Sequence, residues 1–139
     1  MWRRGMNRRE REVMETLERL LHAIYCQDTD TYRDLVADDV SSFEPETPMR
    51  VDTLDFHLHY MRQQKATRSP SAQYRLDIVN PRVQIYGNVA IATYTLVVTH
   101  SDEGGIRFGT INETRVFVRQ DGRWLMVHFH KTPIGSYSA

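Results

Sequence analysis

The chain has 139 residues, of which 40% are hydrophobic and 26% are charged, a composition typical of one globular domain. Eighteen Lys and Arg balance eighteen Asp and Glu, so the net charge is zero when the six histidines are neutral. Because binding to nucleic acid or to an anionic membrane needs a basic surplus, this balance argues against both partners. It also leaves no net repulsion between copies of the chain, which permits self-association.

Cysteine content and hydropathy indicate the cellular compartment of the protein. Cys26 is the single cysteine, which excludes an intrachain disulfide and a cysteine metal cluster and suits a reducing compartment. We interpret it as a small buried hydrophobic residue. No apolar run approaches the roughly 18 residues of a membrane span, and no signal-peptide core follows Met1. We therefore expect a cytoplasmic protein that carries no cofactor.

The clearest element in the sequence is a helix that begins after Asn7. Asn7 and Glu10 have the N-cap and N3 spacing of a capping box. Beyond them, apolar residues recur at helical steps over about five turns, at Val13, Met14, Leu17, Leu20, Leu21 and Ile24. Residues 1–7 lack this periodicity and are expected to form a flexible arm, whereas residues 8–139 are expected to form a single domain.

Shorter elements follow the polar break at residues 27–30. Tyr32, Leu35 and Val36 fit a short second helix. A short strand is predicted over Val40–Phe43, before two prolines stop regular pairing. A third helix is predicted over residues 51–64, with one apolar stripe formed by Val51, Leu54, Leu58 and Met61.

From residue 73 onward the apolar period changes to two, which indicates β-structure. Four strands are predicted, at residues 73–86, 89–101, 106–119 and 123–132. Two-residue turns at Gly87-Asn88 and Asp121-Gly122 and a longer turn at residues 102–105 join them in order. Such short turns require an antiparallel meander.

The predicted sheet is apolar on both faces. In residues 89–98, Val89, Ile91 and Val97 alternate with a second apolar set, Ala90, Ala92, Leu96 and Val98. A sheet with one solvated face alternates apolar and polar residues instead. The predicted helices suffice to cover one face only, so a second copy of the chain is expected to cover the other.

Six short segments carry a family resemblance when they are taken in chain order. They are FEPE at 43–46, LDFH at 54–57, GGI at 104–106, ETRV at 113–116, DGRW at 121–124 and VHFH at 127–130. Together they resemble the association (hub) domain of calcium/calmodulin-dependent protein kinase II, from about residue 10 to about residue 133. The resemblance implies an α+β, cone-like nuclear transport factor 2-like fold, in which a long N-terminal helix packs in a curved antiparallel sheet. It also implies oligomerisation, as dimers stacked into a closed ring of a dozen or more subunits.

Kinase motifs are absent from the sequence, which has no Gly-rich loop and no Asp-containing catalytic loop. Two origins therefore stay open, a hub cut from a larger kinase and a free-standing hub-like protein, and the early Met1 favours the second. Besides itself, the candidate partners are a kinase and a small carboxylate or peptide.

Arg115 is the first candidate for ligand binding. It shares a strand face with Ile111 and Phe117, and a guanidinium among apolar neighbours needs an anion to offset desolvation. By resemblance, family members line the cone cavity with arginines that receive a carboxylate or a peptide. Arg115 matches one of these positions, Lys131 stands where the family has another arginine, and a third arginine is replaced near Thr95. The alternative is a structural Arg115 that pairs internally with Glu44 or Glu113.

Four further residues complete the candidate cavity. His57 matches a family position that faces it, the alternative being a histidine that caps or packs within the third helix. Glu44 with His57, Tyr60 or His130 would make a general acid–base pair in an isomerase, dehydratase or cyclase, which is the alternative function. No nucleophile, cofactor loop or oxyanion hole is identifiable, so we assign no catalytic residue and expect no enzyme activity. His128 and His130 share a strand face, but no third ligand is fixed, so we expect no metal site either.

Overall fold

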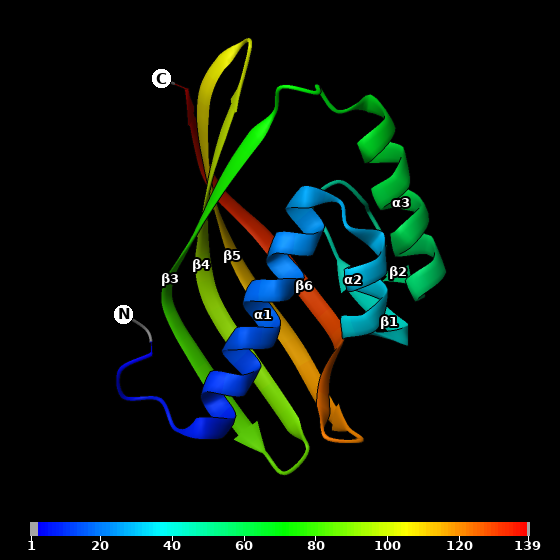
Figure 1. The fold of residues 1–139 in the computed structure, drawn as a ribbon, viewed down its shortest axis with the longest axis vertical. Coiled ribbons are helices and arrows are strands. Elements are labelled where there is room, and N and C mark those ends of the chain that lie inside the picture. Colours follow the sequence, from blue (N-terminus) through cyan, green and yellow to red (C-terminus); the bar gives the residue numbers. More distant parts are fainter. Residues whose placement is uncertain (1–2, 139) are drawn as a thin grey trace.

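The computed structural model describes the backbone of residues 3–138 and the side chains of residues 3–135. Its helices are α1 (Arg8–Cys26), α2 (Thr29–Leu35) and α3 (Leu54–Thr67). Its strands are β1 (Val36–Phe43), β2 (Val51–Asp52), β3 (Gln73–Tyr86), β4 (Val89–Asp102), β5 (Gly105–Gln120) and β6 (Arg123–Ser138). The helices lie on one side of a curved six-stranded sheet, with α1 across the middle of it (Figure 1). The predicted α+β class, with a long N-terminal helix packed in a curved sheet, is confirmed.

Helix α1 forms where its capping signal and its apolar stripe predict it. The side chain of Asn7 accepts from the backbone N–H of Glu10, and the side chain of Glu10 accepts from that of Asn7, so the capping box is confirmed. The apolar stripe of α1 is buried against the sheet and makes up much of the core. Gln27 ends the helix in the left-handed region, at φ 56°. Ahead of α1, Met6 packs against the core and Arg3 pairs with Glu18 at 3.3 Å.

The sheet has the strand order β2-β1-β6-β5-β4-β3. Strands β3 to β6 form the predicted antiparallel meander, and bulges at Val79/Arg82 and Val116/Phe117 bend it. Strand β1 pairs with β6 in parallel, with Ser42 opposite Phe129. This parallel pairing was not predicted from the sequence.

Several element boundaries differ from the prediction. Val36 belongs to β1 and not to the second helix, because the backbone becomes extended there. Residues 51–52 form β2, and α3 begins after Thr53, whose side chain accepts from the N–H of Phe56. Strand β6 continues to Ser138 and so extends past the predicted end at 132.

The two faces of the sheet differ in exposure as the alternation predicts. On the inner face, β4 places Ala90, Ala92, Tyr94, Leu96 and Val98 against the helices, and all are buried. On the outer face lies a group that we call the outer apolar cluster and that is only partly covered: Val89, Ile91, Val116, Val118 and Leu125. The sheet is therefore apolar on both faces, and the helices cover one.

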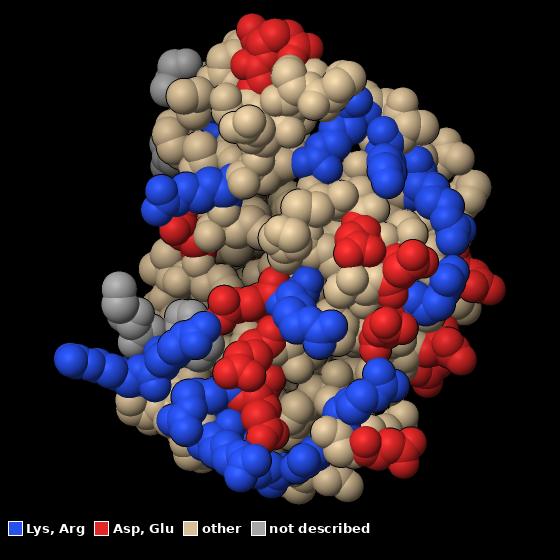
Figure 2. Space-filling model, in the orientation of Figure 1, with Lys and Arg blue, Asp and Glu red and all other residues tan. Residues whose placement is uncertain are grey.

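The helix-bearing side of the molecule carries a mixed surface. Lys and Arg side chains are interspersed with Asp and Glu across it (Figure 2). Cys26 is exposed at the end of α1, so its interpretation as a buried residue was wrong. The sequence pattern did not separate the last turn of the helix from its buried stripe. Among residues 3–138, none of the helices is both long and apolar enough to span a bilayer.

Candidate functional site

Arg115 is the largest fully buried side chain of the described chain. It points from β5 under the helices, where its Nη2 donates to Oε1 of Glu113 at 3.0 Å and its Nε donates to the hydroxyl of Tyr94 at 2.8 Å. The Tyr94 hydroxyl in turn donates to the same Glu113 oxygen at 2.5 Å. The ring of Phe129 lies 4.6 Å from the guanidinium carbon, in cation–π geometry. Of the two internal partners considered for Arg115, the structure selects Glu113.

Burial and neighbouring charges shift the pKa values of this cluster in opposite directions. Burial alone raises the pKa of the Glu113 carboxyl, but the charges of Arg115 and Lys131 and the hydrogen bonds from Tyr94 and Arg115 hold it below its ordinary value. Tyr94 shows the reverse balance, because burial raises the pKa of its hydroxyl far above the ordinary value. Glu113 is therefore an anion that neutralises Arg115 inside the core. Its second oxygen, Oε2, has no hydrogen-bond partner among the described residues.

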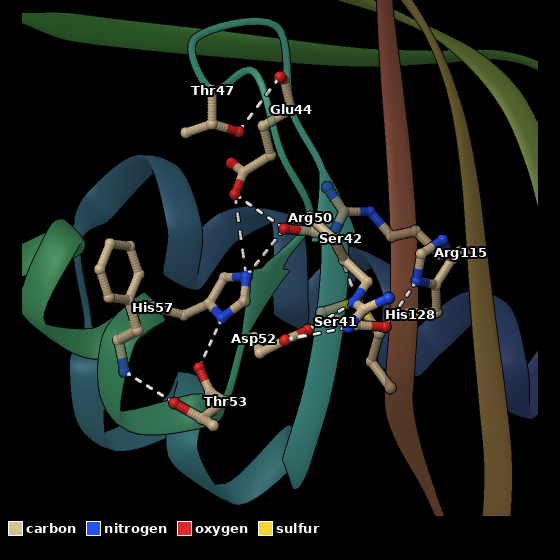
Figure 3. Close-up of polar contacts among 12 residues, drawn as sticks. Ser41, Ser42, Glu44, Thr47, Arg50, Asp52, Thr53, His57, Arg115 and His128 are labelled. Atoms are coloured by element: carbon tan, nitrogen blue, oxygen red, sulfur yellow. Dashed lines mark hydrogen bonds and ion pairs between the residues drawn. The ribbon is translucent and has the colours of Figure 1, made fainter.

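His57 lies in a second cluster, between α3 and β1. Its Nε2 is 2.9 Å from the hydroxyl of Ser42 and 3.7 Å from Oε2 of Glu44, and its Nδ1 is 2.7 Å from the carbonyl oxygen of Thr53 (Figure 3). The Ser42 hydroxyl also contacts Glu44, at 2.8 Å. The imidazole is buried and packs on the ring of Phe129, with centroids 5.5 Å apart. His57 thus packs at the start of α3, with its imidazole buried between α3 and β1.

Tyr60 lies beside His57 and Glu44 and lines the same small pocket, whose volume is only about 10 Å³. A cavity of this size holds at most about one water molecule. Burial raises the pKa of the Tyr60 hydroxyl, and Glu46 and Glu44 raise it further. The Glu44–His57–Tyr60 group is therefore a closed polar cluster.

Lys131 lines a much larger pocket, of about 520 Å³. The end of α1, the segment after β1, the end of α3 and strands β5 and β6 all contribute to its wall. Loss of hydration lowers the pKa of the Lys131 amine, the charge of Arg115 lowers it further, and Glu113, Glu44 and Glu46 oppose these effects. Arg68 also lines this pocket, with its guanidinium carbon 4.1 Å from the Tyr74 ring centroid. This pocket has room for a small ligand.

His130 lies away from the other candidates. It is exposed on the opposite face of the sheet, where it contacts the ring of Phe43 at 5.4 Å and lines a polar groove of about 440 Å³. On the same face, Nδ1 of His128 is 2.8 Å from the hydroxyl of Ser41. Within residues 3–138 no three His, Cys, Asp or Glu side chains are arranged to hold a metal ion.

The structure thus separates the six residues that the sequence grouped into one cavity. Glu44, His57 and Tyr60 stay together, Arg115 is sealed in the core, Lys131 faces the large pocket and His130 faces outward. Sequence reasoning missed Tyr94, Ser42, Gln27 and Arg68. Tyr94 is opposite Glu113 in the β4–β5 register, so the alternation of β4 already placed it on the inner face. For Gln27 and Arg68, which follow the ends of helices, no local pattern gave a signal.

Comparison with known proteins identifies relatives along nearly the whole chain. Residues 9–135 match the family described as the calcium/calmodulin dependent protein kinase II association domain. The hub of this kinase from S. rosetta is 30% identical, with a TM-score of 0.77 over 90% of this chain and 96% of that one. The hub homology domain from Chlamydomonas reinhardtii is 27% identical, with a TM-score of 0.80 over 89% and 97% of the two chains.

More distant structures share the fold alone. A nuclear transport factor 2-like protein from Cytophaga hutchinsonii is 18% identical, with a TM-score of 0.73 over 93% of this chain and all of that one. A putative ketosteroid isomerase from Parabacteroides distasonis is 24% identical, with a TM-score of 0.69 over 88% and 85%. These matches confirm the predicted nuclear transport factor 2-like fold.

Proposed function

Since this chain belongs to the family of calcium/calmodulin-dependent protein kinase II association domains, we propose that it joins copies of itself into a closed ring. Oligomerisation is the function of such a hub, and self-association is therefore the activity of this chain. The ring, its dozen or more subunits, and the extent of the hub as one domain over residues 8–139 are parts of the proposal. We also propose that the ring is non-catalytic and gathers a kinase, either attached to the chain or bound to a free-standing hub.

The outer face of the sheet is the surface that we assign to contact between copies. The outer apolar cluster lies on three adjacent strands, with Ile91 directly opposite Val116. The helices leave this face uncovered, and an extended apolar patch on a folded domain marks an interaction site. Contact through the same patch on both copies gives a two-fold dimer, and a second, different contact then closes the ring.

Native mass spectrometry of the purified chain tests this assignment. We expect a particle of many subunits for the wild type and a much smaller one for the double variant Ile91→Asp/Val116→Asp, because paired carboxylates resist burial in an apolar interface. Met49→Asp is the control, since Met49 is exposed in the β1–β2 connection. A monomeric wild type at micromolar concentration would contradict the hub function, and an unchanged particle in the double variant would contradict the assigned face.

We further propose that the large pocket binds a small carboxylate. Two cationic side chains, Lys131 and Arg68, line it, whereas the charge of Arg115 is neutralised by Glu113. The charge of Lys131 then carries most of the binding, because the guanidinium of Arg115 is already paired with Glu113. Calorimetric titration with benzoate is expected to give roughly tenfold weaker binding for Lys131→Gln and no change for Lys65→Gln. Equal affinity in both variants would exclude Lys131 as the anion ligand.

The alternative function, a small-molecule isomerase, dehydratase or cyclase, has weaker support. Its acid–base residues would be Glu44 and His57, but the pocket they line has a volume of only about 10 Å³ and cannot take a substrate. The likeness to a putative ketosteroid isomerase extends to the fold only.

A further inference from the structure

We propose that Lys131 captures small aldehydes in the large pocket as a reversible imine. The inference concerns the pocket in which we have proposed carboxylate binding, but it uses the neutral amine of Lys131 and not its charge. The two ligands therefore make different demands on the same side chain.

The position of Lys131 is the first observation. Its residue lies opposite Glu113 in the β5–β6 pairing, on the inner face of the sheet, and its side chain lines the pocket. The amine lies 5.4 Å from the centroid of the Phe129 ring. Within the described part of the chain it makes no hydrogen bond or ion pair, although Oε2 of Glu113 also lacks a partner. An amine that is held in a pocket without a carboxylate contact is available to a ligand.

The surroundings of the amine raise the share of its neutral, nucleophilic form above that of an ordinary lysine. Loss of hydration and the neighbouring Arg115 both lower the pKa of Lys131. Desolvation and a nearby cation are the two means by which proteins activate a lysine for attack on a carbonyl group. The charged and titratable groups around the pocket come from every element packed there, and they are Tyr25, Glu44, Glu46, Arg68, Tyr74, Glu113 and Arg115.

The pocket wall indicates which carbonyl compounds fit. Apolar and aromatic side chains form much of it, including Ile24, Ile111, Pro45 and Pro133. Gln27 adds one polar residue to the wall, and its buried Oε1 has no hydrogen-bond partner among the described residues. A volume of about 520 Å³ lies in the range of small-molecule sites. These features suit an aldehyde with an apolar body and one hydroxyl donor.

Formation of the imine releases one water molecule and needs no other co-reactant. The lone pair of neutral Nζ adds to the aldehyde carbon and forms the N–C bond, and a proton moves from nitrogen to the carbonyl oxygen. The resulting hydroxyl group leaves as water with the second Nζ proton, so a C=N bond replaces the C=O bond. Hydrolysis reverses the step, and no redox change occurs. Added cyanoborohydride transfers hydride to the imine carbon while nitrogen keeps a solvent proton, which fixes a benzyl group when the probe is benzaldehyde.

The chain offers a matched internal control, because Lys65 is its one other lysine and is exposed on α3. The purified wild-type protein is treated with benzaldehyde and cyanoborohydride at neutral pH, and the benzyl group is located by peptide mass spectrometry. We expect the ratio of the Lys131 label to the Lys65 label to be higher in the folded protein than in the unfolded chain, because a lowered pKa raises the neutral fraction of the Lys131 amine. The same reaction in concentrated urea gives the ratio for the unfolded chain, which is expected to be near one.

Two variants and a pH series complete the test. Lys131→Arg removes the label from this peptide, because a guanidinium group forms no imine under these conditions. Lys65→Arg leaves the Lys131 label unchanged. The ratio of the Lys131 label to the Lys65 label is expected to fall as the pH is raised. A ratio in the folded protein that is no higher than in urea would overturn the proposal, and it would mean that Oε2 of Glu113 holds the amine as an ammonium ion. Particle mass and benzoate affinity would be untouched by that result, so the hub function and the anion site are tested separately.

Discussion

Arg115 and Glu113 form an ion pair that is closed to solvent on both sides. They lie two residues apart on the inner face of β5, and Nη2 of Arg115 is 3.0 Å from Oε1 of Glu113 with neither side chain accessible. Removing one partner of such a pair leaves a bare charge in the core, which costs about 3–5 kcal/mol, whereas replacing both partners with neutral groups costs much less. This pair therefore holds the fold mainly because breaking it leaves a buried charge. Its net attraction contributes less.

Glu113→Gln is expected to lower the free energy of unfolding by about 3–5 kcal/mol, since it leaves Arg115 buried without a counter-ion. The double variant Glu113→Gln/Arg115→Met is expected to recover most of this loss. Urea unfolding at one fixed subunit concentration measures both. If the double variant is less stable than the single variant, the buried charge is not the cause of the loss.

The carboxylate of Glu113 also predicts how the stability of the protein depends on pH in the acid range. The pKa of Glu113 is lower in the folded chain than its ordinary value of 4.5. A group whose pKa is lowered by folding stabilises the protein above its ordinary pKa, and this contribution is lost as the pH falls through the lower, folded value. The difference in unfolding free energy between the wild type and Glu113→Gln is therefore expected to be constant near neutral pH and to shrink below about pH 4.5. A difference that is the same across the whole range would contradict this assignment.

His57→Ala is expected to destabilise the chain by about 2–3 kcal/mol, because the carbonyl of Thr53 and the hydroxyl of Ser42 each lose a buried partner. Phe56→Ala is the matched control on the same helix, since Phe56 is 51% exposed and its truncation leaves no internal void. Thermal unfolding of the two variants compares them directly. Equal losses would show that the His57 cluster contributes no more than an exposed position.

The imidazole of His128 predicts a second pH dependence of the stability, near neutral pH. Partial burial lowers the pKa of its imidazole below the ordinary 6.5, His130 and Arg50 lower it further, and the hydrogen bond with Ser41 opposes them. Folding therefore favours neutral His128, so its contribution is complete above pH 6.5 and is lost as the pH falls from there toward the lower folded value. We expect His128→Asn to reduce the fall in melting temperature on mild acidification. A fall as large as that of the wild type would assign the dependence to another group.

Local patterns in the sequence predicted the helices and strands. The features that were not predicted depend on contacts between residues that are far apart in the chain. The capping box of α1 joins residues three apart, and the alternation of β4 needs only a short window, so both were found. The pair of Arg115 with Glu113 joins residues two apart on β5, but choosing Glu113 over Glu44 required the position of the segment after β1. The parallel pairing of β1 with β6 depends on strands far apart in sequence, for which alternation gives no register. The large pocket draws its wall from six separate segments, and no spacing rule relates Lys131 to Gln27 or Arg68.

The pairing of β1 with β6 has a consequence for the order of events in folding. Ser41 and His128, which meet across these strands, are 87 residues apart in the chain. Closing so long a loop is slow, and during synthesis β1 has its β6 neighbour only after the whole meander has left the ribosome. Until then the helices have an unfinished sheet to pack on, and inner-face apolar residues stay accessible to other nascent chains. The interval before β6 is complete is therefore the one in which this chain is most open to aggregation.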